Sequence, residues 1–463
     1  MKLHQREIDV SCDSSDLLSS LQEELNRHLE NDEIAIRFAI TEMKGDVLRC
    51  ELGVLEDTDN TFDAISHDAI FQFEKRHVEN TDDFNVVFLV PTGVGSDIGG
   101  HAGDATPVLR AMGAFCDRVI THPNVVNASD INEMPENSLF VEGSVISRLL
   151  MGTIGLQPVR ANRLLLVADK PEKEIFVNNI VNSVSAARAT LGLDVSRVVQ
   201  LDPSIVMKAE YSGSGSAVGY IEGLERLWSA LDEYQGEYDA IALSTVIGVP
   251  LEFHTAYFQS EGDMVNPWGG VEALLTHAVS LLYNLPSSHA PMIESMEVAN
   301  LEIGIVDPRM AAEAVSVSYI HCVLKGLHRS PKIISDKAGM QHHSVLTAAD
   351  ISCLVIPDGC IGLPTLAALE QGISVIAVRE NKNIMRNDLS VLPWKTGQLH
   401  TVENYWEALG VLSAMKAGVS PSAMRRPLEP TRVSSHSTSL LAAQPEETGV
   451  QSADESDETV VKD

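Results

Sequence analysis

The sequence lacks any apolar run long enough to cross a membrane. Its longest runs, Val86–Val90 and Leu164–Ala168, have the size of single strands and fall far short of the roughly 20 residues that a transmembrane helix needs. The first residues, Met1–Glu7, are polar and contain none of the apolar stretch of a signal peptide. We therefore expect a chain without a membrane span and place it in the cytoplasm.

Basic residues are also scarce. The 463 residues include 33 Lys and Arg against 65 Asp and Glu, which leaves a formal net charge of −32. Such a surface repels phosphate backbones and anionic lipids, and no basic run offsets it. We therefore expect neither a nucleic-acid partner nor a membrane partner. A small-molecule ligand is the expected partner, and association into a homo-oligomer is left open.

Cysteines are few and widely spaced. The six lie at positions 12, 50, 116, 322, 353 and 360, without a C-x-x-C pair. This spacing favours neither a structural zinc site nor a disulfide framework. Cys353 and Cys360 flank one predicted strand and its turn, which is typical of small buried residues. A reduced, intracellular chain is the expectation.

What the sequence does contain is a regular alternation of strand-sized apolar runs and helical segments. This alternation is typical of βαβ units with parallel sheets, and 463 residues are too many for one ordinary core. We predict an α/β protein with doubly wound parallel sheets in two Rossmann-like lobes and a small α+β part at the N-terminus. The predicted strands are 34–40, 46–55, 85–90, 163–168, 195–201, 238–244, 332–335, 351–357 and 374–378, and the predicted helices are 16–29, one from about 107, 176–191, 218–231, 311–327, 345–349 and 363–371.

Shifts in composition suggest where the chain divides. The stretch 251–310 is polar and rich in Pro and Gly, and a loop of this length is uncommon unless it is functional. From about residue 425 the sequence turns to Ser, Thr, Pro and acids, which predicts disorder. We therefore predict an N-terminal α+β part (1–84), a first Rossmann-like lobe (85–250), a site-bearing loop region (251–310), a second lobe (311–425) and a disordered acidic tail (426–463).

The first segment with chemical promise is the glycine-rich stretch 91–104 between a predicted strand and a predicted helix. Glycines let backbone amides approach an anion, and the following helix adds a partial positive charge. The spacing departs from the dinucleotide fingerprint and lacks the end of a Walker loop, and a sharp turn is the alternative. The expected ligand-binding residues are Gly93, Gly95, Gly99, Gly100 and Thr106, and Thr106 should also cap the helix. His101 and Asp104 are candidates for proton transfer.

The next polar cluster follows a short strand after that helix. His122 and Asn124 fall at its carboxyl end, the edge of an open α/β sheet where ligands bind. His122 is a candidate proton carrier, and a structural histidine before a proline turn is the alternative. For Glu142, a catalytic base and an acid at a helix start are both left open.

A third cluster lies in the stretch 266–289. Asn266 should cap a turn, Glu272 and His277 should lie on one helix, and Trp268 should form an apolar wall for a ligand. Glu272 and His277 are five residues apart and do not form a metal pair, so no metal site is predicted here. The candidate catalytic residues are Glu272 and His277, and the candidate ligand-binding residues are Asn266, Trp268, Gly269, Gly270 and His289.

The fourth cluster is the strand–turn–helix–strand unit 349–381. Its two strands end in Asp358-Gly359 and Arg379-Glu380-Asn381, and both ends should meet at one sheet edge. This unit resembles the nucleotide-sugar-binding half of two-lobed glycosyltransferases and related epimerases. The resemblance implies that Gly359, Gly362 and Thr365 face phosphate, and the other candidate ligand-binding residues here are Asp358, Arg379 and Asn381.

Over residues 85–425, the segments 91–104, 266–277, 289–292 and 358–381 together resemble a family of cyanobacteria and photosynthetic eukaryotes that is known only as a domain of unknown function. The favoured hypothesis is an enzyme, of transferase or epimerase type, that acts on a phosphorylated or nucleotide-linked small molecule. The cofactor is unknown, and a nucleotide or another phosphate-bearing ligand is suspected. A metal-dependent hydrolase or lyase and a non-catalytic metabolite sensor are the alternatives.

Overall fold

The computed structural model describes residues 1–11, 17–316 and 318–435. Cys12, Asp16 and most of the predicted acidic tail therefore lie outside the described residues. The chain separates into two units, Met1–Val419 and Ser420–Asp463. The described part of the second unit contains the short 3-10 helix η4 (Pro421–Met424) and no other helix or strand. Everything below concerns the first unit.

A seven-stranded, mainly antiparallel sheet is built largely from the N-terminal part of the chain. The predicted strands at 34–40 and 46–55 are confirmed as β2 and β3, and the helix predicted at 16–29 is α1 (Leu17–His28). The sheet has the order β13-β10-β11-β1-β3-β2-β17. Its strands are β1 (Lys2–Ser11), β2 (Glu33–Lys44), β3 (Val47–Glu56), β10 (Val206–Tyr211), β11 (Ala217–Glu222), β13 (Ile247–Gly248) and β17 (Ile361–Gly362).

Two parallel sheets confirm the predicted α/β class. The six-stranded sheet has the order β19-β18-β16-β4-β5-β6, and the four-stranded sheet has the order β14-β12-β8-β9. Their central strands are continuous apolar runs, such as Leu164–Ala168, that are fully buried, as expected for strands covered on both faces. The strands are β4 (Asn85–Phe88), β5 (Arg118–Thr121), β6 (Ser138–Phe140), β16 (Ile351–Pro357), β18 (Ser374–Val378) and β19 (Leu399–Val402) in the first sheet, and β8 (Arg163–Asp169), β9 (Asp194–Leu201), β12 (Ala240–Ser244) and β14 (Ser287–His289) in the second.

The six-stranded sheet combines strands that are far apart in the sequence. Three of its strands come from residues 85–140 and three from residues 351–402. These two stretches belong to the two Rossmann-like lobes that the sequence predicts at 85–250 and 311–425. At its centre, β4 of the first stretch pairs in parallel with β16 of the second.

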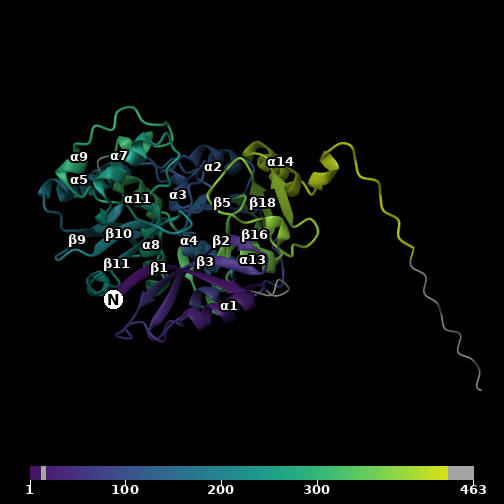
Figure 1. Ribbon diagram of the computed structural model, residues 1–463, viewed down its shortest axis with the longest axis horizontal. Helices are drawn as coiled ribbons and strands as arrows, with labels where there is room; N and C mark the ends of the chain where they lie inside the picture. Colours follow the sequence, from purple (N-terminus) through teal and green to yellow (C-terminus); the bar gives the residue numbers. More distant parts are fainter. Residues whose placement is uncertain (12–16, 317, 436–463) are drawn as a thin grey trace, which may run out of the picture. The chain divides into compact units, whose positions relative to one another are not determined.

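Helices cover the sheets and fill the space between them (Figure 1). α2 (Thr106–Gly113) and α14 (Tyr405–Lys416) pack together beside the six-stranded sheet, and α5 (Glu174–Leu191) and α11 (Ile320–Leu327) pack beside the four-stranded sheet. α8 (Gly269–Tyr283) packs against β11 and β2 on one side and against β14 on another, so it lies between two sheets. α4 (Gly143–Leu150) and α13 (Leu363–Gln371) pack against each other next to α8. The remaining α-helices of the described residues are α3 (Pro123–Val126), α6 (Leu224–Glu233), α7 (Leu251–Gln259), α9 (Met296–Ala299), α10 (Ala311–Ala314) and α12 (Lys337–Met340), and β7 (Gly155–Gln157) and β15 (Lys332–Ile334) form a two-stranded ribbon.

Several local predictions are wrong. The segment predicted as a helix at 218–231 begins as strand β11, because Ala217–Glu222 pairs with both β10 and β1 and Gly223 then turns the chain with a left-handed φ of 79°. The helix predicted at 311–327 is two short helices, α10 and α11, and Tyr319 with φ 53° precedes the second one. The segment predicted as helical at 345–349 contains only the start of a 3-10 helix, since Leu346 forms a β-bridge with Leu156.

Two further corrections concern the polar clusters. Thr106 does not cap α2: Ala105 occupies that position without a side-chain cap, and the Thr106 hydroxyl donates to the Val125 carbonyl oxygen. The stretch 251–310 is not an irregular loop, because it contains α7, α8 and β14, and α8 is buried along most of its length.

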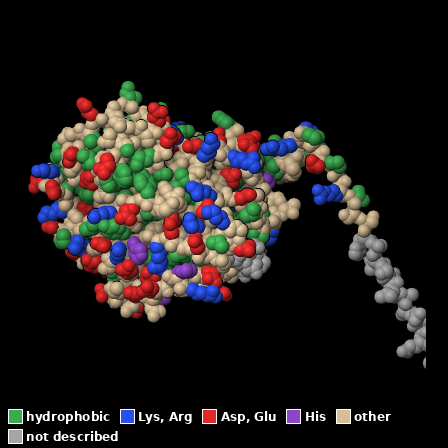
Figure 2. All heavy atoms as spheres, in the orientation of Figure 1, with side chains coloured by type: hydrophobic (Ala, Val, Ile, Leu, Met, Phe, Trp, Pro, Cys, Tyr) green, Lys and Arg blue, Asp and Glu red, His purple; other side chains and the backbone are tan. Residues whose placement is uncertain are grey.

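The charged side chains on the surface agree with the acidic composition of the sequence. Acidic side chains are spread over the visible face with basic ones between them (Figure 2). None of the helices in the described ranges is long and apolar enough to pass through a membrane. The five cysteines in the same ranges are buried free thiols.

Candidate functional site

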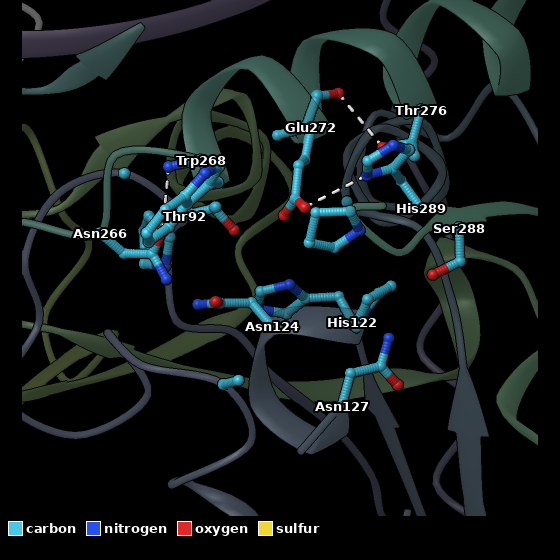
Figure 3. A pocket seen from close by; sticks show the side chains of 18 of the residues that line it. Thr92, His122, Asn124, Asn127, Asn266, Trp268, Glu272, Thr276, Ser288 and His289 are labelled. Carbon is cyan, nitrogen blue, oxygen red and sulfur yellow. Dashed lines mark hydrogen bonds and ion pairs between the residues drawn. The ribbon is translucent and has the colours of Figure 1, made fainter. Parts of the chain in front are cut away.

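A cavity of about 410 Å³ lies where the three large sheets meet. The loops after the parallel strands β4, β5 and β16 contribute to its wall, as do β14, the edge of β2 and one face of α8. The carboxyl ends of parallel strands thus surround it, as is usual for ligand sites in α/β proteins. Labelled side chains from α3 and its two capping residues, from α8 and from β14 surround an open space in Figure 3. The size of the cavity suits a small metabolite.

The cavity brings together parts of all four polar clusters. The predicted site residues that line it are Gly93, Gly100, His122, Asn124, Asn266, Trp268, Gly269, Glu272, His277, His289, Gly362 and Thr365. The predicted site residues that do not line it are Gly95, Gly99, His101, Asp104, Thr106, Gly270, Asp358, Gly359, Arg379 and Asn381.

The glycine-rich loop after β4 is held by side chains rather than left open for a ligand. Asp104 accepts hydrogen bonds from the amides of Gly99 and His101, at 3.0 and 3.2 Å. Asn381 accepts from the Ile98 amide at 2.8 Å and donates to the Ile98 carbonyl. In this conformation these amides are therefore not free to bind an anion. Burial raises the pKa of Asp104 to about 6.

His101 and Glu313 form a buried polar group behind this loop. The Nδ1 atom of His101 lies 2.8 Å from the hydroxyl of Tyr257, and burial lowers the pKa of the histidine. Glu313 accepts from the Ala102 amide at 3.0 Å and from the Asn266 side chain at 3.1 Å. Burial raises the pKa of Glu313 to about 7. Unlike His101, Glu313 lines the cavity, so it adds a titratable carboxyl that the sequence did not single out.

His277 and Glu142 form the closest carboxylate–histidine pair in the cavity wall. Nε2 of His277 lies 3.0 Å from Oε1 of Glu142, whose side chain is 2% exposed. Glu142 also caps α4 by accepting from the amides of Ser144 and Val145, which confirms the predicted acid at a helix start. Burial acts to raise the pKa of Glu142, but His277 and Ser144 outweigh it and the pKa is lowered.

Gly143, the residue after Glu142, explains how the His277 ring comes so close to the Glu142 carboxylate. A β-carbon at Gly143 would lie 3.1 Å from Nε2 of His277, so the absence of a side chain leaves room for the ring. Nδ1 of His277 is buried and has no hydrogen-bond partner among the described residues. In the neutral ring, an Nε2–H directed at the carboxylate leaves Nδ1 as a bare acceptor.

In His122 the donor and acceptor nitrogens are exchanged relative to His277. Its Nε2 accepts a hydrogen bond from the Val90 amide at 3.0 Å, which leaves the proton of the neutral ring on Nδ1. Burial lowers the pKa of His122 to about 4, so the ring is neutral near pH 7. Its neighbour Asn124 donates to the carbonyls of Val90 and Gly99 and so ties the β4 and β5 loops together.

Glu272 is held in place by His289. Nδ1 of His289 lies 3.2 Å from Oε1 of Glu272, and Nε2 accepts from the Thr245 amide at 3.3 Å. The histidine is therefore the donor to the carboxylate. Because Glu272 is 24% exposed and His289 only 1%, the carboxylate reaches the cavity and the ring fixes it from behind (Figure 3).

Asn127 and Ser288 each add to the wall a polar atom that has no partner among the described residues. Oδ1 of Asn127 and Oγ of Ser288 are buried and, among the residues that the structure describes, make no hydrogen bond. Both residues line the cavity and face the same open space in Figure 3. Buried polar atoms are rarely left unpaired, so these two atoms indicate where a ligand or water binds.

The cluster at 358–381 divides between the cavity and the surface. Gly362 and Thr365 line the cavity at the start of α13, and the Thr365 hydroxyl donates to the Cys360 carbonyl at 3.0 Å. Arg379 is exposed and pairs with Glu403 and, at 3.9 Å, with Asp358. The Gly359 amide donates to the side chain of Asp358 at 3.0 Å. This cluster therefore contributes the start of a helix rather than a set of charged ligands.

Trp268 and Asn266 form the other end of the cavity. Asn266 accepts from the Trp268 amide at 3.0 Å, which confirms the predicted turn cap. The indole of Trp268 packs against His254 and Tyr257, with ring centroids 5.1 and 5.3 Å away. Trp268 thus forms a rigid apolar wall just before α8, next to Thr92 (Figure 3).

Arg37 is a cavity-lining residue that is not among those predicted from the sequence. It lines the cavity from β2 and is 9% exposed. A signal existed in the sequence, because an arginine inside the apolar run 34–40 must be buried or reach the sheet edge. Ser288 and Glu313 gave no comparable signal, since neither lies in a recognisable motif.

No group of three or more His, Cys, Asp or Glu side chains in the described ranges is arranged to hold a metal ion.

Comparisons with known proteins place the chain in a family. A family model described as "Protein of unknown function (DUF3326)" matches residues 85–425. A protein of Synechococcus sp. called "Uncharacterized lipoprotein" is 32% identical over 345 residues, which is 73% of this chain and 92% of the relative. No solved structure matches the chain.

Proposed function

The chain belongs to the DUF3326 family, whose function is unknown, and we propose that it is an enzyme that moves a proton on a small metabolite bound in the cavity. The observation that carries the proposal is the complementary pair of histidines. His277 presents a bare Nδ1 and His122 presents an Nδ1–H, and both residues line the same cavity. A base and a hydrogen-bond donor in one enclosed space are the minimum for general acid–base catalysis.

The proposed step is proton abstraction next to a carbonyl group. Nδ1 of His277 takes the proton from carbon, the electron pair of that bond forms the C=C bond of an enolate, and the π electrons of the carbonyl group move onto its oxygen. Nδ1–H of His122 donates to this oxygen, as a neutral imidazole is able to do. Glu142 stabilises the imidazolium that forms on His277. Return of a proton to the opposite face of the same carbon completes an epimerisation. Where that carbon bears a hydroxyl group whose proton moves to the former carbonyl oxygen, return of the carbon-bound proton to the neighbouring carbon completes an isomerisation.

The reaction class follows from the fate of the proton in this step. A proton that is removed and returned needs no second substrate, so the cavity supports the epimerase-type hypothesis better than the transferase-type hypothesis. Glu272, fixed by His289, is a second group that accepts or returns a proton on the same substrate. The phosphorylated or nucleotide-linked nature of the substrate remains part of the proposal.

Hydrogen–deuterium exchange tests the proposal without knowledge of the substrate. The protein is incubated in D₂O with a library of small carbonyl compounds, including acids and phosphate esters, and deuterium incorporation is read by mass spectrometry. We expect at least one compound to gain deuterium, and His277→Gln to slow this exchange by about 10²–10⁴-fold. Glutamine is close in size and still able to donate to Glu142, so the variant removes the base and little else.

The matched control is His342→Gln, which changes an exposed histidine outside the cavity wall and should leave the exchange rate unchanged. If no compound exchanges faster with the wild-type protein than with His277→Gln, the proposed proton transfer is wrong.

For the location, we keep the cytoplasm as our proposal. The Synechococcus relative is called a lipoprotein, which makes attachment to a membrane the competing location. Fractionation of cells that produce the natural chain separates the two: recovery in the membrane pellet that only detergent releases would reject the cytoplasm.

A further inference from the structure

The end of the cavity near Thr92 contains a buried cation that its neighbours do not satisfy. Nη1 of Arg37 is buried without a hydrogen-bond partner among the described residues. Nη1 lies 3.7 Å from Oε2 of Glu51, and Nη2 donates to the Thr92 carbonyl at 3.5 Å. Both distances exceed those of ordinary guanidinium hydrogen bonds. A buried charge in this state is costly unless a further partner binds it.

Glu51 does not need Arg37 to satisfy its own charge. Its Oε1 accepts from the hydroxyls of Ser212 and Ser214, both at 3.0 Å, and its Oε2 accepts from the Gln5 side chain at 2.9 Å. Three neutral donors therefore stabilise this carboxylate. The guanidinium faces this carboxylate at 3.7 Å without a hydrogen bond, so the hydrogen-bonding capacity of Nη1 is left for a ligand in the cavity that Arg37 lines.

Two helix N-termini add to the same positive field. α8 begins at Gly269 and α13 at Leu363, and neither has a side-chain cap. Gly269 lies next to Thr92, since a β-carbon there would be 2.6 Å from the Thr92 side chain. Gly362, just before α13, pairs with Ala39, two residues from Arg37 on β2. Uncapped amides and the helix dipole favour an anion at both places.

From these three groups we infer that the Thr92 end of the cavity is an anion subsite, in which Arg37 and the starts of α8 and α13 bind a carboxylate or phosphate group of the substrate. The inference rests on the proposed function, because the anion belongs to the molecule whose proton is moved. Thr92 and Trp268 lie at one end of the view in Figure 3 and Ser288 and His289 at the other. The subsite thus anchors the substrate by one end and presents the rest to the histidines.

Calorimetric titration of the full chain with inorganic phosphate and, separately, with malonate tests the subsite at constant ionic strength. We expect the wild-type protein to bind at least one of the two anions, and Arg37→Met to weaken that binding at least tenfold. The anion that binds more tightly identifies the group as a phosphate or a carboxylate. If neither anion binds, or if Arg37→Met binds as the wild type does, the subsite is wrong.

A second pair of variants protects the test against misfolding of Arg37→Met. Ala39 lines the cavity on the same strand as Arg37, so a glutamate at 39 reaches the guanidinium and occupies the subsite. We expect Ala39→Glu to abolish anion binding and the isosteric Ala39→Gln to retain it. Equal binding by both variants would also overturn the subsite. Arg379→Met, which removes an exposed arginine outside the cavity, should bind as the wild type does.

The two proposals fail separately. Arg37-dependent anion binding by a protein that exchanges no carbon-bound proton would reject only the proton transfer. If deuterium exchange depends on His277 but Arg37→Met leaves the phosphate and malonate affinities unchanged, only the anion subsite would be rejected.

Discussion

Glu313 shows how burial of a single carboxyl makes stability depend on pH. Burial raises its pKa from 4.5 to about 7, so between these values the folded protein keeps a proton that the unfolded chain releases. The free energy of unfolding therefore falls as the pH rises through this window, by about 3 kcal/mol from this residue. Glu313→Gln removes the titration and keeps an acceptor oxygen for the Ala102 amide.

We therefore predict that Glu313→Gln gains about 3 kcal/mol of stability relative to the wild type between about pH 4.5 and 7.5. Urea unfolding at a series of pH values measures the difference. Glu302→Gln, at an exposed position, is the control and should follow the wild-type curve. If the free energy of unfolding varied with pH in the same way for Glu313→Gln and the wild type, this carboxyl would not be buried as described.

Residue types and spacing anticipated part of the cavity. Asn266 as a turn cap and the glycine start of α8 follow from local rules, because a cap bonds within a few residues. Arg37 and Glu313 could not be placed in this way. Arg37 enters the site because β2 pairs with β17, whose residues lie more than 300 positions away in the sequence. Such contacts depend on topology, which no local pattern encodes.

At the scale of elements, strands buried on both faces were the easiest to predict. β8 and β16 are unbroken apolar runs bounded by polar residues. β11 was missed because Ala217–Glu222 contains two residues of low strand preference, Ala217 and Gly219. Pairing on both sides, with β1 and β10, decides its conformation. Tertiary context thus overrides propensity where a segment lies inside a sheet.

The close packing of α8 on β11 gives a prediction for one element. A β-carbon at Gly270 would lie 1.8 Å from the Ala217 carbonyl oxygen, and backbone cannot move aside as a side chain does. We expect Gly270→Ala to lower the free energy of unfolding by about 3 kcal/mol or more. Because α8 carries Glu272 and His277, the variant should also lose the deuterium exchange. Chemical denaturation measures the first effect.

Gly410→Ala is the matched control for this prediction. Gly410 lies within α14, and a β-carbon there would meet nothing within 4 Å. Alanine is the better helix former, so this variant should gain about 0.5–1 kcal/mol. If Gly270→Ala were as stable as the wild type, α8 would not lie against β11 as described.

For the molecule as a whole, alternation of strands and helices predicted the α/β class but not how the chain distributes its strands. The central pairing of β4 with β16 joins residue 85 to residue 351. Each βαβ unit is recognisable by itself, and nothing within a unit specifies which distant unit becomes its neighbour. The cavity depends on this closure, because it lies between loops from both halves of the six-stranded sheet.

This arrangement predicts how fragments of the chain behave. A chain that ends at Val419 keeps every residue of the cavity wall, so it should retain the wild-type melting temperature and anion affinity. A chain that ends at residue 310 loses β16, β18 and β19, which leaves β4 as an exposed apolar edge strand and removes half of its sheet. We expect this second chain to be unfolded or aggregated, as judged by circular dichroism and size-exclusion chromatography. A folded, monomeric 1–310 fragment would instead mean that residues 85–250 form a lobe of their own, and that the six-stranded sheet is not the unit that closes the cavity.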